Sequence, residues 1–200
     1  MGIRIESRFL ADVVVMVPDI FQDNRGFFLE AFRADHFKAL GLPHVFVQDN
    51  HSRSVKGVIR GLHFQWEPAM AKLMRVSAGS AFLVAVDIRK GSPTLGKWAG
   101  VKASAENRRQ VWAPAGFARG FCALADGTEV QYKCTGIYNG KAESAIQWND
   151  PAIGIKWPVS DPIVSDKDRA AQSLSTWLAS PQSDNFVYSP EPIADLMPGR

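Results

Sequence analysis

The chain is a series of short apolar runs, each bounded by turn-forming residues. Val13–Val17 is a largely β-branched run that stops at Pro18, and the aromatic-rich run Gly26–Phe32 follows the turn residues Asp23-Asn24. Runs of this kind form strands, and turns at such close spacing favour antiparallel pairing. Further runs of this type are Lys72–Val76, Ala81–Ile88, Val111–Trp112, Phe121–Leu124, Glu129–Thr135 and Ser144–Trp148. The sequence therefore predicts an all-β protein, either an antiparallel sandwich or a barrel.

Two glycine-containing pairs mark the tightest expected connections. Ala78-Gly79 separates two of these runs by so few residues that we expect a tight hairpin there. Asp126-Gly127 is a second turn pair, between Phe121–Leu124 and Glu129–Thr135.

Helical signals are few. Arg33–Leu40 places Phe37 and Leu40 on one face and stops at Gly41, and Asp166–Leu178 carries the second signal. Ser165 precedes that segment as an N-cap, with Asp168 three positions on, as in a capping box. With 200 residues the chain fits one domain, which we place at residues 1–180, followed by a Pro-rich C-terminal tail at residues 181–200.

Composition excludes several classes of protein. A net charge of +3 without a basic run argues against nucleic-acid binding. The apolar run near the N-terminus is too short and too charge-flanked for a signal peptide or a membrane span, so we expect a cytoplasmic protein. Two cysteines do not make a disulfide framework, and we expect Cys122 and Cys134 to be buried, reduced thiols.

A metal centre is also not expected. The four histidines, His36, His44, His51 and His63, all precede residue 64, and no His-x-His or His-Glu-x-x-His pair occurs. Later strands therefore offer no second histidine ligand. We expect neither a metal nor another cofactor.

The segment Gly57–Gln65 (GVIRGLHFQ) is the densest group of chemically useful residues. By strand alternation, His63 and Gln65 share one face with Gly61, and Arg60 lies on the other. Gly61 permits close approach of a ligand or of another backbone. A polar face of this kind fits a site, although a hydrogen-bonded core histidine fits the same pattern.

Three other residues are individually weak signals. Lys72 can be a solvated lysine at a strand end, Tyr132 an ordinary inward-facing tyrosine, and Asp168 only a helix-capping residue. Together with His63 they permit one chemistry. A histidine oriented by an aspartate can remove a proton next to a ketone, a lysine can stabilise the enolate oxygen, and a tyrosine can return a proton to the opposite face.

Nine ordered motifs between residues 3 and 180 resemble one family, the metal-free cupin-like nucleotide-sugar epimerases typified by dTDP-4-dehydrorhamnose 3,5-epimerase. The motifs are DNRGFFLEAF (23–32), FVQDNHSRS (46–54), GVIRGLHFQ (57–65), AKLMRV (71–76), VAVDIRKGSPTLGKW (84–98), PAGFARGF (114–121), EVQYKCTGIY (129–138), WNDP (148–151) and SDKD (165–168). The resemblance implies a cupin-type jelly roll with few short helices. It also implies a homodimer that exchanges its N-terminal strands.

The resemblance further implies catalytic roles. His63 matches the family's base, Asp168 the aspartate that partners it, Tyr132 the acid, and Lys72 the lysine after the RGLH segment. It implies substrate contacts as well. Those residues are Arg25, Phe28 and Glu30, which would reach the neighbouring subunit's site, together with Gln48, Asn50, Arg60, Tyr138 and Glu143.

Arg119 departs from the family pattern, which usually has histidine in the corresponding GFAHGF motif. Because arginine does not release its proton at working pH, no titrating role survives at this position. Either Arg119 is a substituted polar contact to the sugar or phosphate, or it alters the substrate or restricts the reaction to one carbon.

We therefore expect a cofactor-independent isomerase that epimerises C3 and C5 of a dTDP-linked 4-keto-6-deoxyhexose. A single-centre epimerase or a 4-keto-sugar isomerase on the same scaffold is the alternative. From other classes, a metal-dependent cupin oxygenase and a non-catalytic sugar-binding β-protein remain open.

Overall fold

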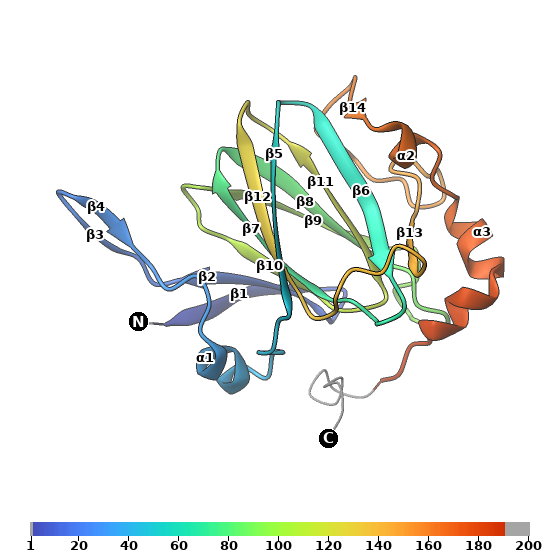
Figure 1. Cartoon of the computed structure of the whole chain (residues 1–200), viewed down its shortest axis with the longest axis horizontal. Coiled ribbons are helices and arrows are strands. Elements are labelled where there is room, and N and C mark those ends of the chain that lie inside the picture. The colour runs from blue at the N-terminus through green and yellow to red at the C-terminus, as the bar shows by residue number, and fades with distance from the viewer. Residues whose placement is uncertain (1, 191–200) are drawn as a thin grey trace.

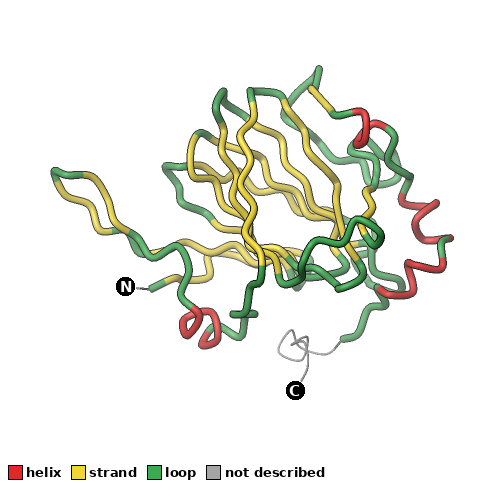
Figure 2. Tube along the Cα trace, in the orientation of Figure 1, coloured by secondary structure: helices red, strands yellow, loops and turns green. Residues whose placement is uncertain are grey.

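Most of the strands pair into two β-sheets that face each other (Figures 1 and 2). The computed structural model describes residues 2–190. One sheet has the order β1-β2-β10-β7-β12-β5, and the other has the order β13-β6-β11-β8-β9 with β14 paired to β6. All pairings between strands are antiparallel except the short parallel pairing of β14 with β6 in the described residues. The jelly-roll class expected from the sequence is confirmed.

The elements, in chain order, are β1 (Ile3–Phe9), β2 (Val13–Pro18), β3 (Phe21–Asp23), β4 (Gly26–Phe28), α1 (Ala34–Ala39), β5 (Gln48–Ser54), β6 (Val58–Gln65), β7 (Lys72–Ala78), β8 (Ser80–Asp87), β9 (Trp98–Ser104), β10 (Gln110–Ala113), β11 (Phe117–Ala123), β12 (Thr128–Cys134), β13 (Glu143–Ala145), β14 (Ile163–Val164), α2 (Asp166–Arg169), α3 (Leu174–Ala179) and the 3-10 helix η1 (Pro181–Asn185).

The main core lies between the two sheets. Met74 on β7 and Val130 on β12 pack there against Phe117 and Phe121 on β11. A second apolar cluster covers the outer face of the β6–β11–β8 sheet, where Trp177 of α3 packs on Phe64 with ring centroids 4.5 Å apart. In Figure 1, α3 accordingly runs along the side of the molecule that carries β13.

The expected hairpin at Ala78-Gly79 is wrong. β7 and β8 belong to different sheets, so the chain turns a corner there instead of pairing with itself. Gly79 has φ +68, and a Cβ on it would lie 2.7 Å from Thr128 Oγ1. The Thr128 hydroxyl in turn lies 3.0 Å from Ser80 O and 2.7 Å from Ala125 O, so its one proton is shared between these two carbonyls. This hydroxyl lies where β11 also crosses to β12, so it holds two sheet-switching corners together.

The segment expected to carry one helix forms two. α2 ends at Arg169 and α3 begins at Leu174, because Ser173 caps a new helix by accepting a hydrogen bond from Thr176 N. Between them, Gln172 O accepts a hydrogen bond from Gln147 N, which fixes the intervening chain against the extension of β13. The shorter N-terminal helix, α1, lies where the sequence predicts it and buries Phe37.

The two cysteines and the start of the tail are both packed. Cys122 and Cys134 are buried and free, as expected. Phe186 is 5% exposed beside Trp177, and Lys90 N donates to Phe186 O at 2.8 Å. The remainder of the segment assigned as a tail, residues 191–200, lies outside the described residues. Within residues 2–190 no helix is long and apolar enough to cross a membrane.

Candidate active site

A pocket of about 150 Å³ opens between the two sheets. It contains side chains from both of them: Ser52, Arg60, His63, Lys72, Met74, Arg119, Gly120, Phe121 and Tyr132. The sequence-predicted residues His63, Lys72, Tyr132, Arg60 and Arg119 are therefore brought together.

The strict alternation predicted along Gly57–Gln65 is wrong at Gly61. Arg119 pairs with His63 and Phe121 with Arg60, so β6 has one more residue than β11 over this stretch. This irregularity turns both Arg60 and His63 into the pocket. A Cβ on Gly61 would lie 2.6 Å from Arg119 O, which confirms the expected close approach of another backbone.

His63 is held by Asp168. His63 Nε2 lies 2.6 Å from Asp168 Oδ1, and Gly61 N donates to Asp168 Oδ2 at 3.2 Å. With Nε2 bonded to the carboxylate, Nδ1 is the ring nitrogen that can accept a proton. The His63 side chain is 27% exposed and lines the pocket, so it is not a fully enclosed core histidine.

Asp168 both caps α2 and orients the histidine. Its backbone N–H donates to Ser165 Oγ at 3.1 Å, as the capping box predicts, while its carboxylate faces β6. Burial opposes ionisation, but hydrogen bonding and the charge of His63, with the Gly61 N–H, hold the pKa of Asp168 below its usual value. Asp168 is therefore an anion at neutral pH.

Lys72 and Tyr132 face each other from neighbouring strands of the first sheet. Lys72 Nζ lies 4.8 Å from the centre of the Tyr132 ring. Burial, with the positive charge of Arg119 as the next cause, lowers the pKa of Lys72 to about 8. Lys72 is thus not the solvated lysine of a strand end. Burial raises the pKa of Tyr132, which keeps its phenol protonated.

Arg119 lies deepest of the cations in the pocket, with only 3% of its surface exposed. Its Nη1 donates to Ala113 O and Pro114 O at 3.3 and 3.1 Å. Burial lowers the pKa of Arg119 to about 10, so the side chain remains charged at neutral pH.

A second cluster of polar side chains connects β5 with the loop before β13 and with β13 itself. Gln48 Nε2 donates to Asn50 Oδ1 at 3.0 Å, and Gln48 Oε1 accepts from Tyr138 N at 2.8 Å. Tyr138 Oη then donates to Glu143 Oε2 at 3.2 Å. The structure therefore brings these four sequence-predicted residues into one network, with Asn50 directly opposite Tyr132 in the sheet.

Sequence reasoning missed Lys167 and the structural role of Gln65. Lys167 Nζ lies 2.6 Å from Glu143 Oε2, and its position directly before Asp168 in the SDKD motif is the signal that could have found it. That hydrogen bond with Glu143 raises the pKa of Lys167. Gln65 does not face a ligand space, because its amide holds Ile137 O and Asn139 N.

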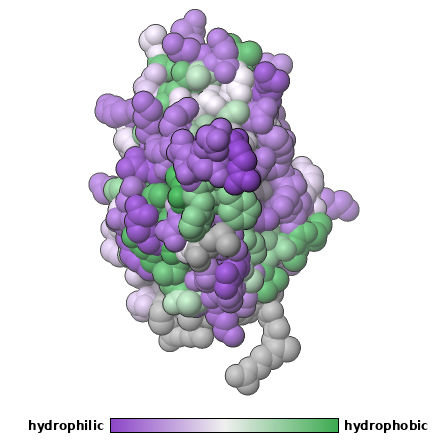
Figure 3. Space-filling view, turned by 90° about the vertical axis from the view of Figure 1, so that its left-hand side faces the viewer, coloured by the Kyte–Doolittle hydropathy of each residue, from purple (hydrophilic) through white to green (hydrophobic). Residues whose placement is uncertain are grey.

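Arg25, Phe28 and Glu30 are not brought to this pocket. They lie on or just after the β3–β4 hairpin, which projects away from the sheets in Figure 1. Phe28 is 59% exposed, and Arg25 pairs with the adjacent Asp23. On the side from which this hairpin projects, hydrophobic residues gather among hydrophilic ones (Figure 3).

Two larger hollows have volumes of about 520 and 370 Å³. The larger one shares Tyr132 with the His63 pocket, and the smaller one includes Phe28 of the hairpin. Arg75 and Gln110 line both of them. Within residues 2–190 no group of three or more histidine, cysteine, aspartate or glutamate side chains could hold a metal ion.

Comparison with known proteins gives a consistent result. The sequence model of the dTDP-4-dehydrorhamnose 3,5-epimerase family matches residues 8–176. The chain is 54% identical over 167 residues to the dTDP-4-dehydrorhamnose 3,5-epimerase of Shigella flexneri, which covers 82% of this chain and 92% of that protein. It is 53% identical over 175 residues to the enzyme of that name from Neisseria gonorrhoeae, covering 87% of this chain but only 52% of the longer relative.

A crystal structure of dTDP-6-deoxy-D-glucose-3,5-epimerase from Legionella pneumophila, in complex with dTDP-4-keto-L-rhamnose, is similar over its whole length. The TM-score is 0.88 at 42% sequence identity, and the match covers 95% of this chain and 100% of that one.

Proposed function

The chain belongs to the dTDP-4-dehydrorhamnose 3,5-epimerase family, and from this premise we propose that the pocket around His63 is where the family's reaction takes place. The protein is an isomerase that epimerises C3 and C5 of a dTDP-linked 4-keto-6-deoxyhexose, giving dTDP-4-dehydro-L-rhamnose. The observation that carries the assignment is that His63 and Tyr132 line one pocket from opposite sheets.

His63 is the base. The hydrogens on C3 and C5 are acidic because each carbon adjoins the C4 ketone. Nδ1 of His63 accepts the proton, and the ionised Asp168 stabilises the imidazolium that forms through the 2.6 Å contact at Nε2. The electron pair of the broken C–H bond moves into the new C=C bond, and the ketone oxygen takes the negative charge.

Lys72 and Tyr132 complete the reaction. The Lys72 ammonium stabilises the enolate oxygen in a partly buried setting, where a fixed cation is more effective than in water. Tyr132 then donates its phenolic proton to the same carbon from the other sheet. Removal from one side and return from the other inverts the carbon, and proton exchange with solvent resets the two groups.

The remaining substrate contacts follow the pocket outward. We assign Arg60 and Arg119 to the sugar and diphosphate region, and Gln48, Asn50, Tyr138 and Glu143 to the nucleotide end. The support is the continuous hydrogen-bonded network that joins the last four, together with the position of Asn50 directly opposite Tyr132 in the sheet.

Exchange in heavy water tests this mechanism. Wild-type protein with dTDP-4-keto-6-deoxyglucose should incorporate deuterium at both C3 and C5, and the product should have the L-rhamnose configuration by NMR. Inversion at one carbon alone would establish the single-centre alternative. His63→Ala should abolish exchange, whereas Tyr132→Phe should abolish inversion while partial exchange persists. Unchanged epimerisation in either variant would refute the assignment.

The hairpin bearing Arg25, Phe28 and Glu30 supports a homodimer that exchanges N-terminal segments. Phe21, Phe27 and Phe28 are each at least half exposed, an unusual concentration of apolar surface on one small element. A second copy would cover these rings and receive the hairpin at its own pocket. A cytoplasmic location also belongs to the proposal, and the two buried free thiols are compatible with a reducing compartment.

Subunit mixing tests the exchange. Refolding equal amounts of inactive His63→Ala and inactive Phe28→Ala subunits together should restore roughly a quarter of wild-type activity per chain, because a mixed dimer then contains one intact pocket served by one intact hairpin. Light scattering should give twice the chain mass. No recovery in proven mixed dimers would mean that each hairpin serves its own subunit.

A further inference from the structure

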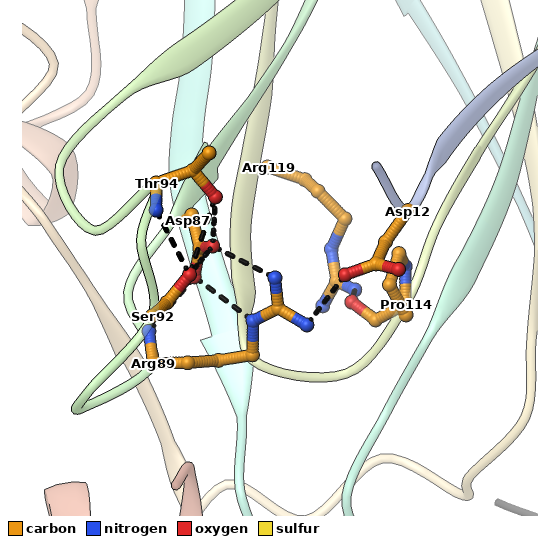
Figure 4. Close-up of polar contacts among 7 residues, drawn as sticks. All are labelled: Asp12, Asp87, Arg89, Ser92, Thr94, Pro114 and Arg119. Atoms are coloured by element: carbon orange, nitrogen blue, oxygen red, sulfur yellow. Dashed lines mark hydrogen bonds and ion pairs between the residues drawn. The ribbon is translucent and has the colours of Figure 1, made fainter. Parts of the chain in front are cut away.

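Arg119 is a buried arginine whose guanidinium is bonded on one side only. Nη1 is anchored to the carbonyls of Ala113 and Pro114, but Nε and Nη2 are buried without a hydrogen-bond partner among residues 2–190. No carboxylate of that part of the chain forms a salt bridge with it. In Figure 4, dashed lines join Asp12 and Asp87 to Arg89, whereas the Arg119 side chain lies beside Pro114.

Nε and Nη2 form one complete edge of the guanidinium, the edge that donates two parallel hydrogen bonds. Other arginines of this molecule use the same two atoms. Arg33 and Arg89 donate one hydrogen bond to each carboxylate oxygen of Asp35 and Asp87. In Arg25 and Arg75 the two atoms converge on one oxygen, of Asp23 and Gln131 respectively. In Arg119 this edge is unpartnered, although it is the most buried of the five side chains.

The position of the edge indicates what it binds. Arg119 lies between Phe117 and Phe121 along β11, and those two rings pack in the core between the sheets. The Arg119 side chain therefore points inward, to the same pocket as His63 and Lys72. Desolvating a cation without a partner is costly, so two oxygens of a bound molecule are the natural complement.

We propose that Arg119 is a specificity-determining residue for the C3 step, donating from Nε and Nη2 to the oxygens on C3 and C4 of the sugar. This inference rests on the proposed function and deepens it. The 3-hydroxyl and the 4-keto oxygen are neighbours on adjacent carbons, so one planar fork can reach both.

The fork fits the C3 intermediate better than the C5 intermediate. When C3 loses its proton to His63, the C3=C4 bond forms and the charge moves to the C4 oxygen. Both oxygens then lie in the plane of that double bond, as two acceptors matched to a planar donor pair. When C5 loses its proton, the double bond forms between C4 and C5 instead. The C4 oxygen then lies cis to the C6 methyl group, and the 3-hydroxyl remains on a tetrahedral carbon, out of the plane of the double bond. Arg119 therefore stabilises the first intermediate more than the second.

The experiment measures deuterium incorporation at C3 and at C5 separately, for wild type and for Arg119→Lys. Lysine retains the charge but lacks the fork. We expect C3 exchange to fall on the order of a hundredfold, as when a positioned donor to a developing oxyanion is lost, while C5 exchange falls only slightly. Starting from the substrate and, separately, from the product removes any effect of the order of the two steps.

Arg89→Lys is the matched control, because Arg89 is also a partly buried arginine but its edge is closed by Asp87. The C3-to-C5 ratio does not depend on the fraction of folded protein, so the control should retain the wild-type ratio even if it is less stable. Binding of dTDP alone, measured by calorimetry, should be nearly unchanged in Arg119→Lys.

Three results would overturn the proposal. These are equal loss at both carbons, unchanged exchange at both, or a large loss of dTDP affinity with an unchanged ratio, which would assign the edge to the diphosphate. Absence of any exchange in the wild-type protein would instead refute the proposed function itself, so the two failures are distinguishable.

Discussion

The surroundings of two arginines, the partly buried Arg89 and the buried Arg119, differ in whether every side of the guanidinium has a hydrogen-bond partner within the described residues. Around Arg89, the carboxylate of Asp87 receives the guanidinium, the Ser92 hydroxyl and the Thr94 hydroxyl, and Asp12 takes the remaining side of the arginine (Figure 4). Around Arg119, only backbone carbonyls are bonded. A closed network holds the fold together, whereas an open one is completed by what binds.

The largest expected effect is in the pocket that contains Arg119, at the pair formed by His63 and Asp168. Asp168→Asn should lower kcat by roughly 10²–10⁴-fold, because an amide neither fixes the His63 tautomer nor stabilises its charged form. Initial-rate assays with the 4-keto sugar substrate measure this. Since Asn can still bond Gly61 N, the thermal midpoint should change little. A variant with full activity would show that the 2.6 Å contact is only structural.

The next largest effect is expected in the fully bonded network around Arg89. Arg89→Met leaves the carboxylates of Asp87 and Asp12 without their cation, and breaking a buried pair in this way costs about 3–5 kcal/mol of unfolding free energy. Urea denaturation followed by tryptophan fluorescence measures the loss. Activity per folded molecule should be unchanged, because Arg89 does not line the pocket. A stable Arg89→Met protein would contradict the structural role.

Arg119→Met makes the same substitution at the arginine whose guanidinium edge has no partner within the described residues, and so allows a direct comparison with Arg89→Met. Removing a buried cation that has no anionic partner should leave the unfolding free energy unchanged or raise it by about 1 kcal/mol. Activity should nevertheless fall sharply. If Arg119→Met destabilises the protein as much as Arg89→Met does, the two arginines do not differ in the way proposed.

The smallest effect is a shift in pH dependence. Lys72 faces Arg119 from β11, Tyr132 and Cys134 from β12, Glu143 from β13 and His63 across the pocket. Because it must be protonated to stabilise the enolate, kcat/KM should decline as the pH rises through its pKa of about 8. Arg119→Gln removes a positive charge beside it, so its pKa should rise and the decline should move to higher pH.

Stability has the opposite dependence on pH in the same region. The folded state binds the Lys72 proton more weakly than the unfolded chain, in which the lysine has its ordinary pKa of 10.5. The unfolded state therefore holds more protons between pH about 8 and 10.5, and the Lys72 contribution to unfolding free energy rises with pH there. A Lys72→Met variant, which cannot titrate, should lose that rise in urea titrations. Retention of the rise would assign it to another group.

Much of this could be predicted from the sequence, because it depends on local patterns. Runs such as Val13–Val17 specify strands, and Ser165 with Asp168 specifies a helix start. What failed depends on pairing across the sheets. The direction of Arg60 follows from a register irregularity against β11, and the corner at Gly79 follows from contact with Thr128.

The unpartnered edge of Arg119 was likewise invisible in the sequence, which identified only the unusual residue. Whether an arginine is satisfied depends on which carbonyls and carboxylates the fold brings to it. Here those are Ala113 and Pro114 on one side and, within residues 2–190, nothing on the other.

The sheet-switching corners also affect how the chain folds. β2 pairs with β10, and β5 pairs with β12, so each early strand waits for a partner that is synthesised some 80 to 100 residues later. Closing such long loops costs chain entropy before the strands have paired. Folding is therefore slow, and the edges of the early strands stay exposed until their partners arrive. During synthesis the first sheet cannot be completed until Cys134 has left the ribosome. When the protein is produced rapidly at high temperature, we therefore expect more of it to be lost by aggregation of unfinished chains than by unfolding of the folded enzyme.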